Sequence, residues 1–402
     1  MIWKTLALLS ASVALAVPAV LVAAEEAAVE DRIPRPGPPP DVSPESVYEA
    51  VGRGIGFLVE SQNPDGSWGG VRRTKGLNIM AHVPGSHHAF TAATTALAVE
   101  ALCLYPRHSE EAEAAIDLAQ DYLLEHLPRV RRATGTELYN VWAHAYAVKA
   151  LLLLHERADG DDELQARLAE AIQGQVNRLE AFQFVDGGWG YYNFGMATAV
   201  SSGQPTSFTT GTALIALRQA KDAGYEVSEL IVERALRSMF MQRLPDGSFV
   251  YSFGHRMRPR SEVSRPAGGL ARAQVCNAAG RMWTGDEHVS DQDMIDWLDR
   301  MITRGFWLDQ ARKRPRPHEG HFANAGYYFY YGYYYAGEVA RLLSEDDFAP
   351  RRNHLKQVLI NLQEKDGSWW DFPLYDYHQP YGTALALSAL YKMTGESDTD
   401  RL

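Results

Sequence analysis

The sequence predicts an all-α fold, an α6/α6 toroid in which six helix pairs of about 60 residues form two concentric helix rings. Three observations predict it. A short Asp-Gly motif followed by an aromatic residue recurs at one period, each copy ends an amphipathic segment, and nearly uncharged helical segments lie between the copies. A fixed period of this length indicates a repeat architecture, in which neighbouring units bury each other's apolar faces.

The repeated motif places an aromatic residue at positions 68, 189, 249 and 369, with spacings of 121, 60 and 120 residues. One period of about 60 residues fits all three spacings if two further copies are degenerate. Since glycine accepts positive φ, the Asp-Gly pair predicts a tight turn, and the aromatic side chain can lie back across the end of the preceding helix. The structural motif residues are Gln62, Asp65, Gly66, Trp68, Asp186, Gly187, Trp189, Asp246, Gly247, Phe249, Gln363, Asp366, Gly367 and Trp369.

Two classes of helix alternate along the chain. Helices of the first class carry charges on one flank, which predicts an outer ring in contact with water; we expect them at 47–60, 110–126, 163–181, 228–241, 291–303 and 350–362. Helices of the second class are rich in Ala, Thr and Leu and nearly uncharged, which predicts a buried inner ring; we expect them at 88–104, 138–155, 208–220, 270–283, 327–343 and 381–393.

The first residues are typical of a secretory signal. Lys4 precedes an apolar run from Leu6 to Val22, and small residues follow at 23–24. We therefore predict a signal peptide at 1–24, a Pro-rich linker at 25–45, the toroid at 46–394 and a tail at 395–402. The predicted location is exported, periplasmic or extracellular, without a transmembrane segment after signal cleavage.

Charge and cysteine content narrow the class of protein. The net charge is −11, and removal of Lys4 with the signal makes it −12, so nucleic acid is a poor partner.

Only two cysteines occur, Cys103 and Cys276, both in apolar helical segments. Buried free thiols are the simpler interpretation, and a disulfide between them stays open.

The repeat resembles the QW motif of squalene–hopene cyclases and of the related protein prenyltransferases. The copies that carry the resemblance are Gly56 to Trp68 and Asn361 to Trp369, and the similarity extends from about Ser46 to Met393. It implies an α6/α6 toroid with a central cavity. It does not imply one activity, because one fold hosts many functions.

The catalytic signatures of these families are absent from the corresponding positions. No inner-helix start carries the Asp-x-Asp-Asp run with which the cyclases protonate an alkene. The zinc pattern of the prenyltransferases fails as well, because Gln274 stands two residues before Cys276 and Ala336 stands one period later. Catalysis is therefore unproven, and we predict no cofactor and no metal.

Candidate cavity residues lie where inner helices begin or carry polar and aromatic groups. The run from Tyr327 to Tyr335 is the most unusual segment, and its aromatic faces suit cations, apolar chains or sugars. Arg272 is a candidate partner for a carboxylate or phosphate. The candidates are His87, His88, Tyr139, His144, Arg272, Cys276, Tyr327, Tyr331 and Tyr334.

Three functions remain open at this point. The first is binding of an apolar or isoprenoid-like ligand in a central aromatic cavity. The second is a divergent terpene-cyclase-like or carbohydrate-active enzyme, for which a glycan is the alternative ligand. The third is a non-catalytic scaffold that binds a protein partner through its outer face, and exposed apolar patches would distinguish it.

Overall fold

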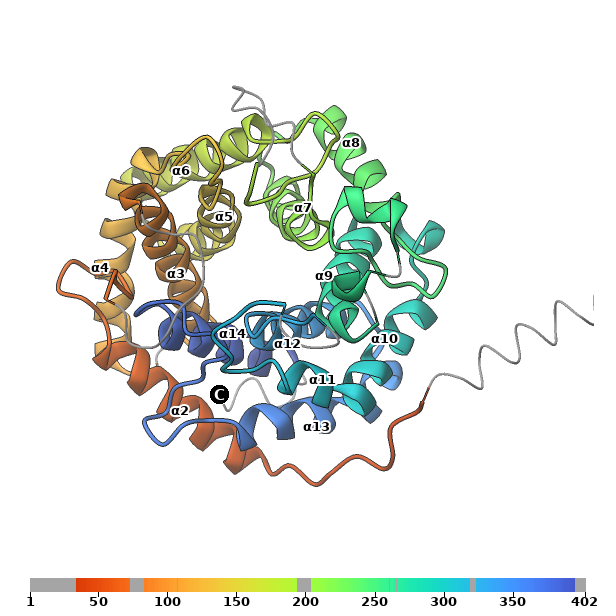
Figure 1. The fold of residues 1–402 in the computed structure, drawn as a ribbon. Helices are drawn as coiled ribbons and strands as arrows, with labels where there is room; N and C mark the ends of the chain where they lie inside the picture. The colour runs from red at the N-terminus through yellow and green to blue at the C-terminus, as the bar shows by residue number, and fades with distance from the viewer. Residues whose placement is uncertain are drawn as a thin grey trace, which may run out of the picture.

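The computed structural model describes residues 34–72, 83–106, 108–193, 204–259, 261–264, 266–318 and 323–394. The predicted signal peptide and the predicted C-terminal tail lie outside these ranges. The described helices form two concentric rings (Figure 1). No helix within the described ranges combines the length and the apolar composition that a membrane span requires.

The inner ring is closed, because each inner helix packs against the next and α14 packs against α3 (Figure 1). Most of their described residues are buried, as their near lack of charge predicted. The inner helices are α3 (Pro84–Cys103), α5 (Asn140–Arg157), α7 (Ser207–Asp222), α9 (Pro266–Thr284), α12 (Tyr328–Ala340) and α14 (His378–Lys392).

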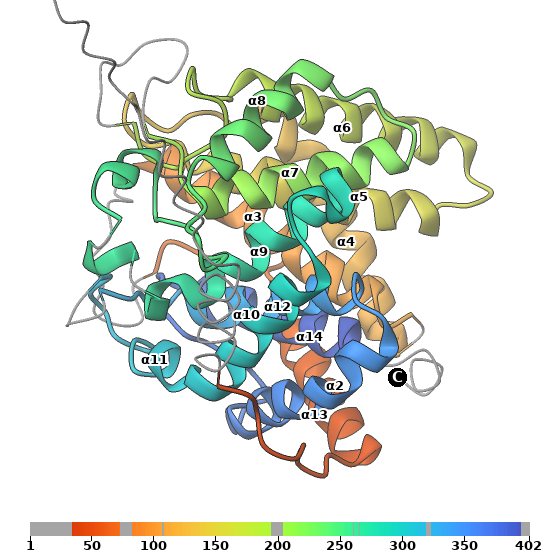
Figure 2. The same cartoon turned by 90° about the vertical axis from the view of Figure 1, so that its right-hand side faces the viewer.

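The outer ring surrounds the inner one (Figure 1), and the view turned by 90° shows outer helices at opposite edges of the barrel (Figure 2). Side-chain oxygens of Ser43, Ser109, Asp161, Ser290 and Ser344 cap the first turns of five of them, which explains where these helices begin. The outer helices are α2 (Pro44–Glu60), α4 (Glu110–His126), α6 (Asp162–Ala181), α8 (Glu229–Phe240), α10 (Asp291–Arg304) and α13 (Glu345–Asn361).

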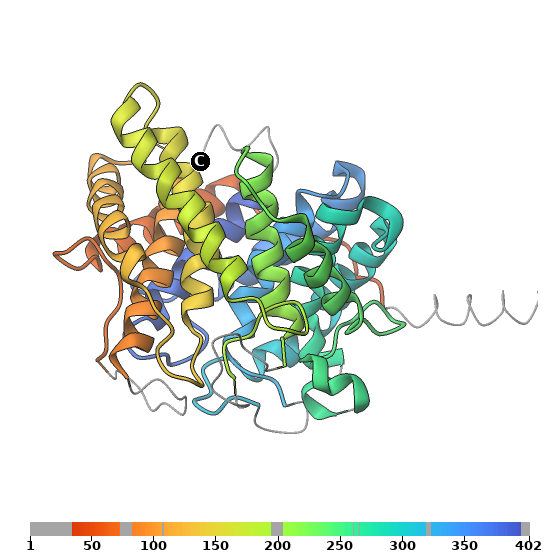
Figure 3. The ribbon, with the colours of Figure 1, turned by 90° about the horizontal axis from the view of Figure 1, so that it is seen from above.

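The predicted all-α toroid is confirmed, and the described residues contain isolated β-bridges but no strand. An equal six-fold repeat in the sequence stays a prediction. In Figure 3 long loops lie along the lower edge of the barrel. The short turn from α5 to α6 lies at the opposite, upper edge. Of the two cysteines, Cys276 is buried and Cys103 is half-buried, and both are free thiols.

Each tryptophan of the repeated motif closes the end of the helix before it. The indole Nε1 atoms of Trp68, Trp189 and Trp369 donate to the carbonyl oxygens of Leu58, Leu179 and Leu359, each at 2.7 Å. Their backbone N–H groups donate to threonine hydroxyls of the inner ring, those of Thr95, Thr210 and Thr383. The tryptophan thus supplies a hydrogen-bond donor to a carbonyl of the last helical turn, which has no partner within the helix, and it also connects an outer helix to an inner one.

The same turn is also hydrogen-bonded to the next outer helix. Gln62 Nε2 donates to the carbonyl of Ala115 in α4 at 2.8 Å, and Gln363 Nε2 donates to the carbonyl of Ala50 in α2 at the same distance. Gly66, Gly187 and Gly367 have positive φ and lie directly against carbonyl oxygens of the next outer helix. The contact of Gln363 joins the last outer helix to the first, so the ring closes through the same contact that joins α2 to α4.

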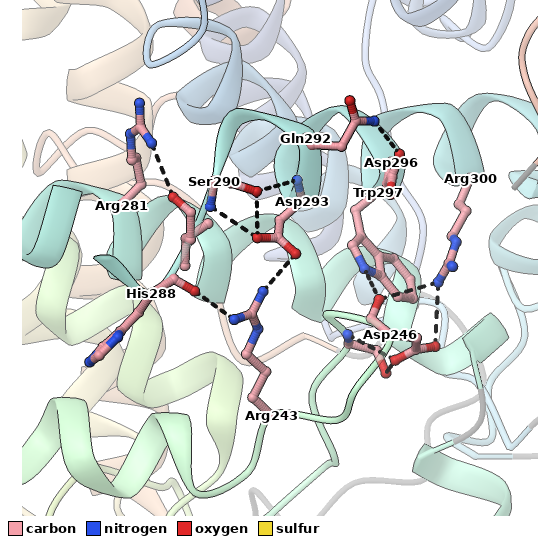
Figure 4. A network of polar contacts seen from close by, with 12 residues as sticks. Arg243, Asp246, Arg281, His288, Ser290, Gln292, Asp293, Asp296, Trp297 and Arg300 are labelled. Carbon is pink, nitrogen blue, oxygen red and sulfur yellow. Dashed lines mark hydrogen bonds and ion pairs between the residues drawn. The ribbon is translucent and has the colours of Figure 1, made fainter. Parts of the chain in front are cut away.

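At one turn a phenylalanine stands in place of the motif tryptophan, and a tryptophan of a neighbouring helix packs there. At the turn of Asp246 and Gly247 the motif ends in Phe249, and Trp297 of α10 donates its indole N–H to the Asp246 carbonyl at 2.9 Å. Arg300 stacks on the Trp297 ring and pairs with the Asp246 carboxylate (Figure 4). The aromatic anchor therefore comes from the next outer helix rather than from the turn.

The two degenerate copies coincide with irregular helix ends. Helix α4 runs into the 3₁₀ turn η1 (Leu127–Arg129), and α10 is followed after Gly305 by the short helix α11 (Phe306–Asp309). Further 3₁₀ turns are η2 (Phe253–Met257), η3 (Glu262–Ser264) and η4 (Gly285–Glu287). The missing Asp-Gly motifs thus correspond to helix ends with a different connection.

Substitution of Gly367 by alanine tests the joint between α13 and α2. Gly367 has a φ of 86°, and a Cβ there would overlap the Arg53 carbonyl oxygen of α2. We expect Gly367→Ala to lower the free energy of unfolding by about 3 kcal/mol, the sum of left-handed strain and this clash. The measurement is urea denaturation followed by circular dichroism.

The matched control is Gly160→Ala. Gly160 has a φ of 90° and no atom within 4 Å of the added Cβ, so it reports the backbone strain alone. We expect a loss of about 1 kcal/mol for it. Equal losses for the two variants would contradict a role of the joint beyond backbone strain.

Candidate ligand-binding site

A cavity lies at the centre of the inner ring, where the first turns of several inner helices meet. Its volume is about 150 Å³, the size of a cavity that accommodates one six-membered ring. Eleven of the sixteen lining side chains are aromatic and none is charged. They are Phe90, Ala93, Thr94, Leu97, Tyr139, Trp142, Tyr146, Tyr191, Phe208, Tyr327, Tyr328, Tyr331, Phe372, Leu374, Tyr381 and Leu385.

The aromatic rings of the wall pack against one another and hold each other in place. The Phe208 ring stands edge-on to those of Tyr328 and Tyr331, with centroids 5.3 and 6.2 Å apart, and stacks with Trp142 at 6.1 Å. Such edge and stacked pairs are favourable for aromatic quadrupoles. The cavity therefore has a wall of mutually braced rings.

The hydroxyl groups of three lining tyrosines are hydrogen-bonded to residues of the protein. Tyr331 Oη lies 2.9 Å from Thr212 Oγ1 and donates to the Phe208 carbonyl, and Tyr381 Oη donates to Asp371 Oδ1. Tyr327 Oη pairs with His318 Nε2 at 3.1 Å. Because these hydroxyls are engaged, the phenols present mainly ring surface to the cavity, which is apolar despite its tyrosines.

A buried charge cluster joins four inner helices, three of them near their C-terminal ends. Lys149 Nζ lies 2.9 Å from Glu100 and 2.7 Å from Glu338, and Lys392 Nζ lies 3.1 and 2.9 Å from the same carboxylates. Tyr334 donates its hydroxyl to both oxygens of Glu100. Two cations and two anions balance in this cluster, which is the condition under which charges tolerate burial.

The lysines decide the ionisation of this cluster. Burial would raise the pKa of Glu338, but Lys149 and Lys392 outweigh it and hold the pKa of that carboxyl well below its usual range. The same two lysines outweigh burial at Glu100 and lower its pKa as well. Both carboxylates are therefore ionised at neutral pH, so neither serves as a proton donor to the cavity.

One buried carboxyl next to the cavity wall, that of Asp371, has a raised rather than a lowered pKa. Asp371 accepts hydrogen bonds from the Tyr330 backbone N–H at 2.9 Å and from the Tyr381 hydroxyl at 2.5 Å. Burial is the largest influence and raises the pKa of Asp371 to about 6. Its carboxylate bridges the first turn of α12 and helix α14, and it stands behind Tyr381 rather than among the lining residues.

Of the nine residues predicted for the cavity, Tyr139, Tyr327 and Tyr331 line it. His87 lies beside it, because its ring contacts Phe90 edge-on with a centroid distance of 6.4 Å and its Nδ1 lies 3.3 Å from the Tyr377 hydroxyl. Arg272 lies behind the lining residue Tyr328, with its guanidinium carbon 5.7 Å from the centre of that ring.

The structure corrects the expected position of four residues, which lie outside the cavity lining. His88 and His144 turn toward outer helices: the His88 ring meets that of His126, and His144 Nδ1 bonds Gln175 Oε1 at 2.8 Å. Burial, the largest cause at both, lowers the pKa of His88 and brings that of His144 to about 4. Cys276 is fully buried in α9, and Tyr334 belongs to the charge cluster.

Sequence reasoning missed most of the lining. Phe90, Trp142, Phe208 and Tyr381 each stand in the first or second turn of an inner helix, and Tyr191 follows a motif tryptophan by two residues. A search for large aromatic residues at inner-helix starts would have found the first four. No sequence pattern indicated Asp371 or the charge cluster, since residues far apart in the sequence form these contacts.

The sequence matches the model of one protein family. The squalene-hopene cyclase C-terminal domain matches residues 42–251, more than half of the chain. The chain belongs to that family. None of the curated proteins compared with it matches by sequence.

Solved structures similar to this family member are distant in sequence. A possible member of the GH105 family from Klebsiella pneumoniae has 13% identity and a TM-score of 0.51, covering 89% of this chain and 95% of its own. The type II terpene cyclase MstE from Scytonema has 13% identity and a TM-score of 0.47, covering 87% and 98%. The GH76A α-1,6-mannanase from a Salegentibacter species has 10% identity and a TM-score of 0.48, covering 86% and 98%. The first of these supports the fold alone.

Substitution of Asp371 by asparagine tests the electrostatics of the cavity wall. The folded-state pKa of about 6 lies above the ordinary 3.8, so the folded state binds more protons than the unfolded state between these values. This carboxyl therefore costs the wild type stability as pH rises from 4 to 7. We expect Asp371→Asn, which lacks the titration, to gain about 2 kcal/mol relative to the wild type over that range.

The measurement is urea denaturation of both proteins at pH 4, 5, 6 and 7. Taking the difference between variant and wild type cancels the other titrating groups. A difference that is flat with pH, or that moves against the variant as pH rises, would contradict a raised pKa at Asp371.

Proposed function

We propose that this exported family member binds an apolar, isoprenoid-like ligand in the central cavity. The observation that carries the proposal is the lining: sixteen side chains without a charge, with eleven aromatic rings. An apolar chain gains free energy from removal of this surface from water and needs no polar partner. The volume of about 150 Å³ suits the end of such a chain.

The engaged tyrosine hydroxyls favour an apolar ligand over a glycan. A sugar in a cavity needs donors and acceptors that face it, because a buried hydroxyl without a partner costs free energy. The hydroxyls of Tyr327, Tyr331 and Tyr381 are instead bound to wall residues. A glycan therefore stays the weaker alternative.

Binding is also preferred over catalysis for a chemical reason. Alkene protonation and glycoside hydrolysis both require an acid that faces the reacting atoms. Among the described lining residues none is an acid, and Asp371 stands behind Tyr381 with both carboxylate oxygens engaged. A divergent enzyme remains the second hypothesis.

A protein partner on the outer face remains the third hypothesis, with little support. Large apolar side chains that are exposed there lie apart on different elements, such as Leu118 on α4, Leu230 on α8 and Phe306 on α11. Scattered exposure of this kind is normal for a protein surface.

Native mass spectrometry of the protein purified from its source tests both parts of the proposal. We expect the mature mass that begins at residue 25, recovered outside the cytoplasm, together with a stoichiometric apolar adduct that solvent extraction releases. A full-length cytoplasmic protein would contradict export. A bound glycan in place of an isoprenoid-like molecule would support the enzyme hypothesis instead.

Filling the cavity should abolish binding. Ala93 lines it from α3 and is 7% exposed, so Ala93→Phe places a ring in the space that we assign to the ligand. We expect its affinity for geraniol, measured by isothermal titration calorimetry, to fall at least tenfold, about 1.4 kcal/mol or more. The control Leu118→Phe adds the same residue at a half-exposed site on α4 and should leave affinity unchanged. Equal affinity of both variants would place the ligand elsewhere.

A further inference from the structure

The central cavity occupies only part of the length of the inner ring. On α3 its lining residues run over two turns, from Phe90 to Leu97, and on α12 they end at Tyr331 in the first turn. On the side of the helix starts, loop residues such as Tyr191 and Phe372 complete the lining. We call the other side the inner end, where the last lining residues of four helices are Leu97, Tyr146, Tyr331 and Leu385.

The buried charge cluster lies directly beyond this inner end. Each inner-end residue is followed, three or seven positions later, by one member of the cluster: Leu97 by Glu100, Tyr146 by Lys149, Tyr331 by Glu338 and Leu385 by Lys392. Residues spaced in this way share one face of a helix, so the cluster continues the cavity-facing sides of the helices by one or two turns. An apolar chain that entered from there would have to part buried ion pairs, which is costly.

The Tyr331 ring lies between the cavity and the cluster and is held from two sides. Its Oη donates to the Phe208 carbonyl at 3.1 Å and lies 2.9 Å from Thr212 Oγ1. In the next turn Tyr335 donates to the same threonine at 2.9 Å, and its ring centre lies 4.7 Å from that of Tyr331. Since all of these residues are buried, Tyr331 forms a fixed apolar surface with a polar layer behind it.

We propose that the apolar chain of the ligand enters methyl end first from the side of the helix starts, and that Tyr331 ends its path and so sets the chain length that the cavity accepts. This inference rests on the proposed function and adds the orientation and the length of the ligand to it. The polar end of the ligand stays near the helix starts, because a hydroxyl at the apolar inner end would be buried without a partner.

The test is a chain-length profile, in which straight 1-alkanols from 1-butanol to 1-decanol are titrated into the protein by calorimetry. Each methylene that enters the cavity adds about fourfold to the affinity, and one that stays outside adds much less. A volume of about 150 Å³, which holds one six-membered ring, has room for about six carbon atoms. We expect the affinity to rise to about that length and then to level off, with a ratio of 1-octanol to 1-hexanol affinities below about 2.

Variants assign this break in the profile to Tyr331. Tyr331→Ala should move the break by about two carbon atoms or more and raise the 1-octanol to 1-hexanol ratio to about 16, which is fourfold for each of two methylenes. Tyr331→Phe keeps the ring and removes the hydroxyl, so the break should stay. If Tyr331→Ala fails to fold, Tyr331→Leu should move the break by about one carbon atom.

The matched control is Phe90→Ala, which removes a ring from the other end of the same lining. It should weaken binding without moving the break to longer chains, whereas a general loosening of the cavity would move it in both alanine variants. A purely structural role of Tyr331 would lower all affinities alike and leave the break in place.

The outcomes separate this inference from the proposed function. A break that Tyr331→Ala leaves in place, one that Phe90→Ala moves equally far, or a fourfold gain per carbon atom that continues to 1-decanol overturns the assignment to Tyr331 and leaves cavity binding intact. Binding of none of the alcohols at millimolar concentration overturns both.

Discussion

The Asp-Gly turn at the end of the outer helices is the contact on which the toroid depends. It binds several elements at once: the tryptophan closes the helix before it, a threonine of the inner ring holds the turn, and a glutamine grips the next outer helix. Only glycine can lie against the carbonyl oxygen of that next helix with positive φ. Because the joint at Gln363 reaches back to α2, the last repeat uses the same chemistry as the first, and the ring closes.

The inner helices pack directly against one another in a closed ring, so their starts lie around one centre. Large aromatic residues occupy those starts, so they meet there and leave a small apolar cavity between their rings. Toward the other end of the same helices, Glu100, Lys149, Glu338 and Lys392 form a neutral cluster. The inner ring is thus apolar where the helices begin and cross-linked by charges where several of them end, which stabilises the barrel without leaving an acid in the cavity.

The apolar wall of the cavity is the feature with the most direct bearing on function. Most of the wall resembles a protein core in which each tyrosine hydroxyl has a local partner. Behind this wall, the carbonyl oxygens of Phe249 and Val263 hold the buried Arg272 guanidinium, which lies against the ring of Tyr328. The Asp-x-Asp-Asp acid is absent from the inner-helix starts of this family member, and none of the described lining residues is an acid.

The sequence by itself determined the helix rings, because period, helix ends and charge patterning are local properties. The predicted helices agree with the observed ones to within a few residues at most ends, and the tryptophans cover helix ends as their position after the turn implied. Only the tertiary structure decided which side chains face the centre. His144 and Tyr139 stand five residues apart at the start of α5, yet one packs on an outer helix and the other lines the cavity. Side-chain direction on a helix that is buried all round leaves no trace in hydrophobic periodicity. Lys392 reaches Glu100 only because closure of the ring packs α14 against α3.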